Sequence, residues 1–201
     1  MITHAHLTKA ISYTQYRDRI DNLLKENKTT GENHTKELIA YTRLNVHRMH
    51  RIEKQATLIP ELDANLKQPM KKELWIIISE AWCGDAAQSV PALQRIAQAS
   101  DDITLKILLR DENLDVMDKY LTNGSRSIPK LICLDAETLE EKWTWGPRPA
   151  EAQALMNTLK KNENLTKEDK AAKLHGWYAK NKTESLQNEI WNLLKDEIVF
   201  I

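Results

Sequence analysis

Leu74-Trp-Ile-Ile-Ile-Ser-Glu-Ala-Trp-Cys-Gly-Asp85 opens the stretch that decides the fold of this 201-residue chain, and the stretch continues to Pro91. Residues 74–78 are all apolar, a run too short for a buried helix and typical of a strand buried on both faces. A helix is predicted directly after this strand, because apolar residues recur at helical spacing through Ala99, namely Ala86, Ala87, Val90, Leu93, Ile96 and Ala97. Cys83 therefore falls at the strand-to-helix turn, at or near the helix N-terminus.

A cysteine at a helix N-terminus is a candidate nucleophile. The first-turn N–H groups and the helix dipole stabilise a thiolate, so we expect Cys83 to have a pKa below the ~8.5 of a free thiol. Asp85 opposes this effect, because a negative charge near the sulfur raises the thiol pKa. Asp85 is interpreted either as a favourable first-turn residue of the helix or as a proton-handling group in catalysis.

The segments that follow predict more strands and helices in alternation. Strands are expected at 103–109, 130–134 and 138–145, the last as an antiparallel edge strand. A helix is expected at 114–121, where Asn123-Gly124 ends it, and another at 151–161. The strand at 130–134 is preceded by Arg126-Ser127-Ile128-Pro129.

These features together resemble the thioredoxin family, and within it a bacterial branch that carries Trp-Cys-Gly-Asp. The usual signature is Trp-Cys-Gly-Pro-Cys with a proline eight residues after the first cysteine, and this chain has Trp82-Cys83-Gly84 and Pro91. Asp85 stands in the place of the signature proline, and the next residue, an alanine, in that of the second cysteine. The resemblance covers about 74–160 and implies an α/β thioredoxin-like fold, a central mixed sheet flanked by helices.

The resemblance also implies a cis peptide bond between Ile128 and Pro129 that lies against Cys83. In the family this bond presents the backbone of the preceding residue to an extended substrate. The expected active-site support around Cys83 therefore consists of Trp82, Gly84, Asp85, Ile128 and Pro129.

The sequence predicts a monothiol rather than a dithiol site. Ala86 replaces the resolving thiol, and Cys133 would lie about 13 Å from the proline along an extended strand. A disulfide needs Cα atoms within about 7 Å, so Cys133 is interpreted as a small buried hydrophobe. Ile77 occupies the position, six residues before the cysteine, where many family members carry a buried acid.

Two functions remain open. The leading prediction is a thiol oxidoreductase of monothiol type, in which Cys83 forms a mixed disulfide that an external thiol resolves. The alternative is a redox-inert thioredoxin-fold module that binds a peptide or protein partner. No cofactor is expected beyond a low-molecular-weight thiol acting as co-substrate.

Three arginines are expected near the turn. Arg110, Arg126 and Arg148 are candidates for binding the carboxylates of a small thiol substrate such as glutathione. Alternatively they form structural ion pairs with the acids of the same region, Glu80, Asp85 or Asp111.

Composition limits the partners. The 29 basic and 29 acidic residues give zero net charge, which argues against a nucleic acid bound by bulk electrostatics. No apolar run approaches the ~20 residues of a membrane span, and no signal-peptide pattern is seen. Two cysteines cannot make a disulfide framework, so a cytoplasmic protein is expected. No metal site is expected, although His47 and His50 have i, i+3 spacing.

The chain is divided into three parts. Residues 1–60 predict an N-terminal helical region with helices at 8–25 and 34–56, the second a candidate part of the core. Residues 61–161 are assigned to the thioredoxin-like core, and 162–201 to a C-terminal helical extension with helices at 167–181 and 184–198. No convincing strand precedes the helix at 34–56, so the first strand of the family is expected to be missing or vestigial. The oligomeric state is left open.

Overall fold

A four-stranded mixed sheet forms the centre of the computed structural model, which describes residues 2–195. The strands are β1 (Glu73–Ser79), β2 (Ile103–Leu109), β3 (Lys130–Asp135) and β4 (Glu141–Trp145), in the spatial order β2-β1-β3-β4. β1 pairs in parallel with β2 and antiparallel with β3, and β3 pairs antiparallel with β4. The predicted α/β fold with a central mixed sheet is confirmed.

β1 is buried along its whole length. Its side chains alternate between two hydrophobic clusters, with Trp75 and Ile77 in one and Leu74, Ile76 and Ile78 in the other. The first cluster is covered by helices on one face of the sheet and the second by helices on the opposite face. The continuous apolar run thus reflects a strand that contacts both layers of the protein.

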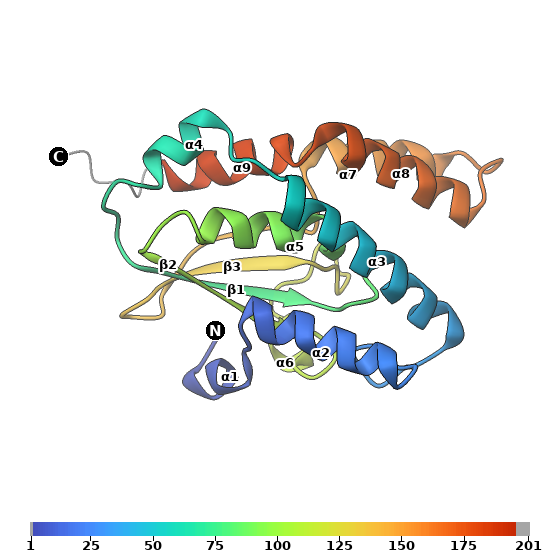
Figure 1. The fold of residues 1–201 in the computed structure, drawn as a ribbon, viewed down its shortest axis with the longest axis horizontal. Helices are drawn as coiled ribbons and strands as arrows, with labels where there is room; N and C mark the ends of the chain where they lie inside the picture. Colours follow the sequence, from blue (N-terminus) through green and yellow to red (C-terminus); the bar gives the residue numbers. More distant parts are fainter. Residues whose placement is uncertain (1, 196–201) are drawn as a thin grey trace.

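Helices enclose the sheet on both sides (Figure 1). α5 (Gly84–Ala97) lies on one face together with α3 (Lys36–Gln55) and α9 (Glu184–Leu194), while α4 (Pro60–Asn65) packs on α9. α1 (His4–Lys9) and α6 (Leu114–Met117) lie on the opposite face, and α2 (Tyr13–Lys25) packs on α3 and β2. α7 (Ala150–Lys161) and α8 (Lys167–Asn181) pack against each other beyond α5.

Two helix predictions were wrong. The single helix expected at 8–25 is broken, because Ile11 forms an antiparallel bridge with Ile107 of β2 and Ser12 begins a new helix as its N-cap. The helix expected at 114–121 ends at Met117, after one turn. In both places tertiary contacts or turn chemistry override the helical spacing.

The remaining helix and strand predictions agree with the structure within a few residues. β2 and α8 have the predicted bounds, and α3 occupies the segment predicted for the second helix. The last helix was predicted to reach residue 198; α9 ends at Leu194, and residues 196–201 lie outside the described part of the chain.

The first strand of the family is reduced to a remnant. Among residues 2–195, no strand precedes β1 in the sheet. At the outer edge of β2, where another strand could pair, Ile11 alone exchanges two backbone hydrogen bonds with Ile107, of 2.9 and 2.7 Å. The expectation of a missing or vestigial strand is therefore confirmed.

The cap of α2 gives a first prediction. The Ser12 Oγ accepts a hydrogen bond from the Gln15 N–H at 3.2 Å, so Ser12→Ala should lower the free energy of unfolding by about 1 kcal/mol. Urea titration measures the loss. As a control, Thr158→Ala removes a hydroxyl that only bonds its own helix, and should be nearly neutral. Equal stabilities for the two variants would contradict the capping role.

Candidate active site around Cys83

Cys83 is the N-cap residue of α5, as the sequence predicts. Its sulfur accepts a hydrogen bond from the Ala86 N–H at 3.5 Å and donates one to the Ile128 carbonyl oxygen at 3.2 Å. The Ile128–Pro129 peptide bond is cis. The turn after β1 and the segment before β3 therefore meet at the sulfur atom.

The thiol of Cys83 is held in its protonated form. Burial, followed by the negative charge of Asp85, raises the pKa of the thiol to about 12. Hydrogen bonds from the N–H groups of the first turn oppose the increase but do not overcome it. The expectation of a thiol pKa below 8.5 was wrong, because the loss of hydration outweighs the helix N-terminus.

Asp85 links the turn to the C-terminal helices. The residue is 8% exposed, and its carboxylate forms an ion pair with Arg148 and accepts a hydrogen bond of 2.8 Å from the Tyr178 hydroxyl of α8. Arg148 also donates to the Gln153 Oε1 at 2.9 Å. These contacts satisfy Asp85 and hold it near the sulfur.

The other two candidate arginines also carry carboxylate partners. Arg126 binds Asp118 through a bidentate pair that is about half exposed. Arg110 pairs with Asp111 and lies over the Trp82 ring, 4.7 Å from its centroid. The ion pairs of Asp85 and Asp111 are among those considered as an alternative to ligand binding, so a binding role for Arg110, Arg126 and Arg148 stays a prediction.

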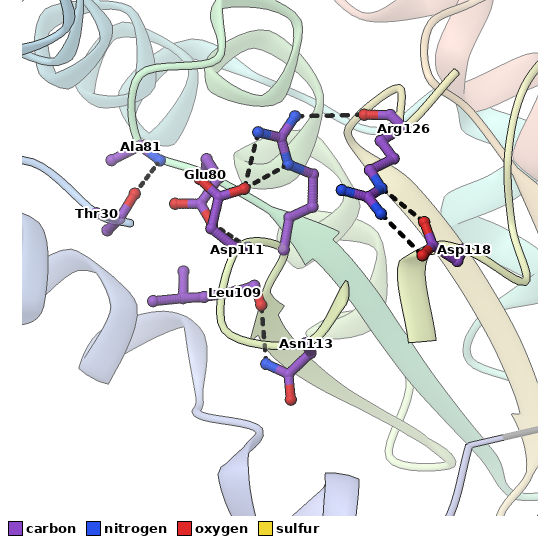
Figure 2. A network of polar contacts seen from close by, with 9 residues as sticks. Thr30, Glu80, Ala81, Leu109, Asp111, Asn113, Asp118 and Arg126 are labelled. Carbon is purple, nitrogen blue, oxygen red and sulfur yellow. Dashed lines mark hydrogen bonds and ion pairs between the residues drawn. The ribbon is translucent and has the colours of Figure 1, made fainter. Parts of the chain in front are cut away.

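A buried acid that was not predicted from the sequence lies three residues before Cys83. Glu80 is 0% exposed and accepts a hydrogen bond of 2.9 Å from the Asp111 N–H, in the network shown in Figure 2. Its Oε2 has no hydrogen-bond partner among the described residues. Burial raises the pKa of Glu80 to about 7 despite hydrogen bonds from Asp111 and Thr30. The signal in the sequence was its position directly after a fully buried strand.

A pocket of about 820 Å³ opens beside Cys83. Its walls come from α3, the N-terminus of α5 and the α7–α8 hairpin, and include Trp82, Gly84, Asp85 and Arg148. Arg48 of α3 and His175 of α8 also line this wall, and neither was predicted from the sequence. The amphipathic spacing of α3 could have suggested Arg48, whereas nothing in the sequence brings α8 to the active site.

His175 packs directly on the active-site turn. A Cβ atom added to Gly84 would lie 2.8 Å from the imidazole ring, so glycine permits this close approach. The His175 Nδ1 lies 3.2 Å from the Gln88 amide nitrogen. Burial, with the charge of Arg48, lowers the pKa of His175 to about 4, so its ring is neutral at physiological pH.

Cys133 lies within the sheet, far from a resolving position. It is 0% exposed and pairs in register with Trp75 of β1, and neither cysteine forms a disulfide. The interpretation of Cys133 as a buried core residue is confirmed. In the described range 2–195, no group of three or more metal-ligating side chains is assembled, and no helix has the length and apolar content that a membrane span requires.

Comparisons with known proteins agree with the fold. The family model described as thioredoxin matches residues 31–189, more than half of the chain, so the chain belongs to the thioredoxin family. The match begins before α3 and ends within α9, and thus includes helices that line the pocket.

Two solved structures are similar in fold. One is a protein of unknown function from Pseudomonas aeruginosa, with a TM-score of 0.61, 17% identity, and 98% and 99% of the two chains covered. The other is an HIV epitope scaffold, with a TM-score of 0.55, 17% identity, and 92% and 98% covered. A search of curated proteins finds no significant match.

The influence of Asp85 on the thiol can be tested by alkylation. Asp85→Asn removes the negative charge, so the pKa of Cys83 should fall and iodoacetamide should react faster at pH 7. For each unit of decrease the thiolate fraction rises tenfold while its nucleophilicity falls about threefold, a net gain of about threefold. The control is Asp118→Asn, which removes the carboxylate that pairs with Arg126 and should leave the alkylation rate unchanged. An unaltered rate–pH profile for Asp85→Asn would contradict the assignment.

Glu80 should make stability depend on pH. Its pKa is raised in the folded state, so its contribution is fully present below about pH 4.5 and is lost as the pH rises through about 7. Glu80→Gln cannot ionise, so its free energy of unfolding relative to the native protein should rise by about 3 kcal/mol between these pH values. Urea titrations at several pH values measure this difference. Parallel stability curves would show that Glu80 does not titrate as described.

Proposed function

We propose that the protein is a thiol oxidoreductase of monothiol type, with Cys83 as its nucleophile. The observation that carries the proposal is the position of the Cys83 sulfur, at the start of α5, beside the Ile128 carbonyl and on the wall of an open pocket. Ala86 occupies the place of a resolving thiol, and Cys133 is buried in β3. The resolving sulfur must therefore come from outside the chain.

The reaction has two exchange steps. The Cys83 thiol loses its proton to solvent, and the thiolate attacks one sulfur of a substrate disulfide while the other sulfur leaves as a thiolate. An external thiolate then attacks the substrate sulfur of the mixed disulfide and releases Cys83. In the net exchange one sulfur of the substrate disulfide is released as a thiol, and the other ends in a disulfide with the external thiol, which is oxidised in its place.

The environment of the thiol makes the first step dependent on pH. With a pKa near 12, the thiolate is a small fraction at neutral pH, although each thiolate is a stronger nucleophile than one of lower pKa. The rate of the first step is therefore expected to rise with pH up to alkaline values. A reducing compartment such as the cytoplasm, rich in small thiols, is the proposed setting.

The raised pKa favours a second candidate, the redox-inert module that binds a peptide or protein partner. In this alternative Cys83 is a structural N-cap whose S–H donates to the Ile128 carbonyl. Serine can cap a helix and donate the same bond, so Cys83→Ser would retain partner binding.

Formation of the mixed disulfide distinguishes the two functions. The reduced protein, incubated with bis(2-hydroxyethyl) disulfide at pH 8, should gain one adduct on Cys83 that excess thiol removes. Peptide mass spectrometry locates the adduct. Cys133→Ser should behave like the native protein, and Cys83→Ser should form none.

A resolving thiol can also be restored. In Ala86→Cys, the introduced thiolate should attack the Cys83 sulfur, form an internal disulfide and release the adduct as a thiol, without any external thiol. The absence of any adduct on Cys83 over hours, with the fold intact, would overturn the oxidoreductase proposal in favour of the binding module.

A further inference from the structure

We propose that the pocket beside Cys83 binds a small organic anion, a thiol or disulfide that carries carboxylate or phosphate groups, through Arg48, Lys160 and Lys170. The inference rests on the proposed function, since it names the substrate class of the same site. The binding groups come from the helices around the core and differ from the three arginines indicated by the sequence.

The charge of the pocket is unlike that of the chain. The whole protein has zero formal net charge, yet the pocket wall carries five lysines and arginines against two carboxylates. Both carboxylates already have cationic partners, Asp85 with Arg148, and Glu37 with Lys167 at 3.4 Å. Arg48, Lys160 and Lys170 remain as a local excess of positive charge, which attracts anions.

A network of hydrogen bonds holds Arg48 in place on the pocket wall. The Asn45 side chain donates to the Ala81 carbonyl of the active-site turn at 2.8 Å and accepts from the Arg48 Nη1 at 2.7 Å. A Cβ added to Gly84 would lie 3.7 Å from the same Arg48 nitrogen. The guanidinium is therefore fixed close to the nucleophile and does not extend freely into solvent.

Arg48 lacks a carboxylate partner. Across residues 2–195, no Asp or Glu forms an ion pair with it, and its guanidinium is partly buried. Burial and the nearby Arg51 lower the pKa of Arg48, and the more distant charge of Asp85, which pairs with Arg148, only partly opposes this decrease. An anion bound in the pocket would supply the missing charge and bidentate acceptors.

The other walls fit a small molecule. A volume of about 820 Å³ lies within the ~300–1,000 Å³ of typical small-ligand sites. Apolar and aromatic side chains line part of it, including Leu38, Tyr41, Met156 and Leu174. The ligand would place its sulfur at Cys83, an apolar body on this wall, and its anionic groups at Arg48 and the two lysines.

Charged thiol reagents can measure this preference directly. The anionic sulfonatoethyl and cationic trimethylammonioethyl methanethiosulfonates both transfer their thioalkyl group to the Cys83 thiolate and release methanesulfinate. The rate with the anionic reagent is divided by the rate with the cationic reagent, and this ratio is normalised to the same ratio for 2-mercaptoethanol. The normalised ratio should exceed about 10 in dilute buffer and approach 1 in 1 M salt. Because both reagents attack the same thiolate, the pKa of Cys83 cancels in this ratio.

Variants on the same two helices assign the preference to particular residues. Arg48→Gln and Lys170→Gln should each reduce the normalised ratio several-fold, whereas Lys54→Gln on α3 and Lys173→Gln on α8, both outside the pocket wall, should leave it unchanged. A normalised ratio of 1 or less, or an equal response from pocket and control variants, would overturn the proposal.

A binding measurement separates this inference from the proposed function. In Cys83→Ser, which cannot react, calorimetry with tricarballylate and with inorganic pyrophosphate should detect binding of one of them, and the stronger probe identifies carboxylate or phosphate as the preferred group. Arg48→Gln in this background should weaken the binding of the stronger probe at least fivefold, and Lys173→Gln should leave it unchanged. Binding here with no mixed disulfide in the native protein would support the anion site and reject the oxidoreductase; no binding of either probe would reject the anion site.

Discussion

The two-sided burial of β1 is the constraint on which the rest of the structure depends. Its side chains fill both hydrophobic clusters, and a one-residue shift of register would move the Trp75 ring into the cluster that now holds Leu74, Ile76 and Ile78, so close packing opposes the shift. Its end is therefore fixed, and so is the turn that follows. Cys83 becomes the N-cap of α5 at a defined place in the molecule, within reach of the Ile128 carbonyl.

The helices outside the core determine the electrostatics of this turn. α8 contributes the Tyr178 hydroxyl that holds Asp85, and the neutral imidazole of His175 that packs on Gly84. α3 contributes Asn45, which binds the backbone of the turn. These groups pack around the half-buried sulfur, and desolvation is the largest influence on its pKa, which the first-turn N–H groups do not overcome.

Local patterns in the sequence were sufficient for the core and for the position of Cys83. The apolar run of β1 and the helical spacing after it located Cys83, and β2 and α8 have the predicted bounds. The break before Ser12 and the partners of Asp85 depend on residues far apart in the chain. The sign of the thiol pKa shift likewise depends on burial, a property of the whole fold that no local motif carries.

The high pKa of Cys83 would slow both steps of the proposed exchange, the second through its effect on the leaving group. In a mixed disulfide, the sulfur whose thiol has the lower pKa leaves faster, and Cys83 with a pKa near 12 is a poor leaving group compared with an ordinary thiol near 8.5. An external thiolate that attacks the substrate sulfur must expel Cys83, so this step is slow. Asp85 already contributes to this high pKa, and an anion bound in the pocket would raise it further, because both disfavour a thiolate there. Under the proposed function, the site would therefore be better suited to retaining a covalent partner than to rapid turnover, and capture and catalysis would differ only in how long the mixed disulfide persists.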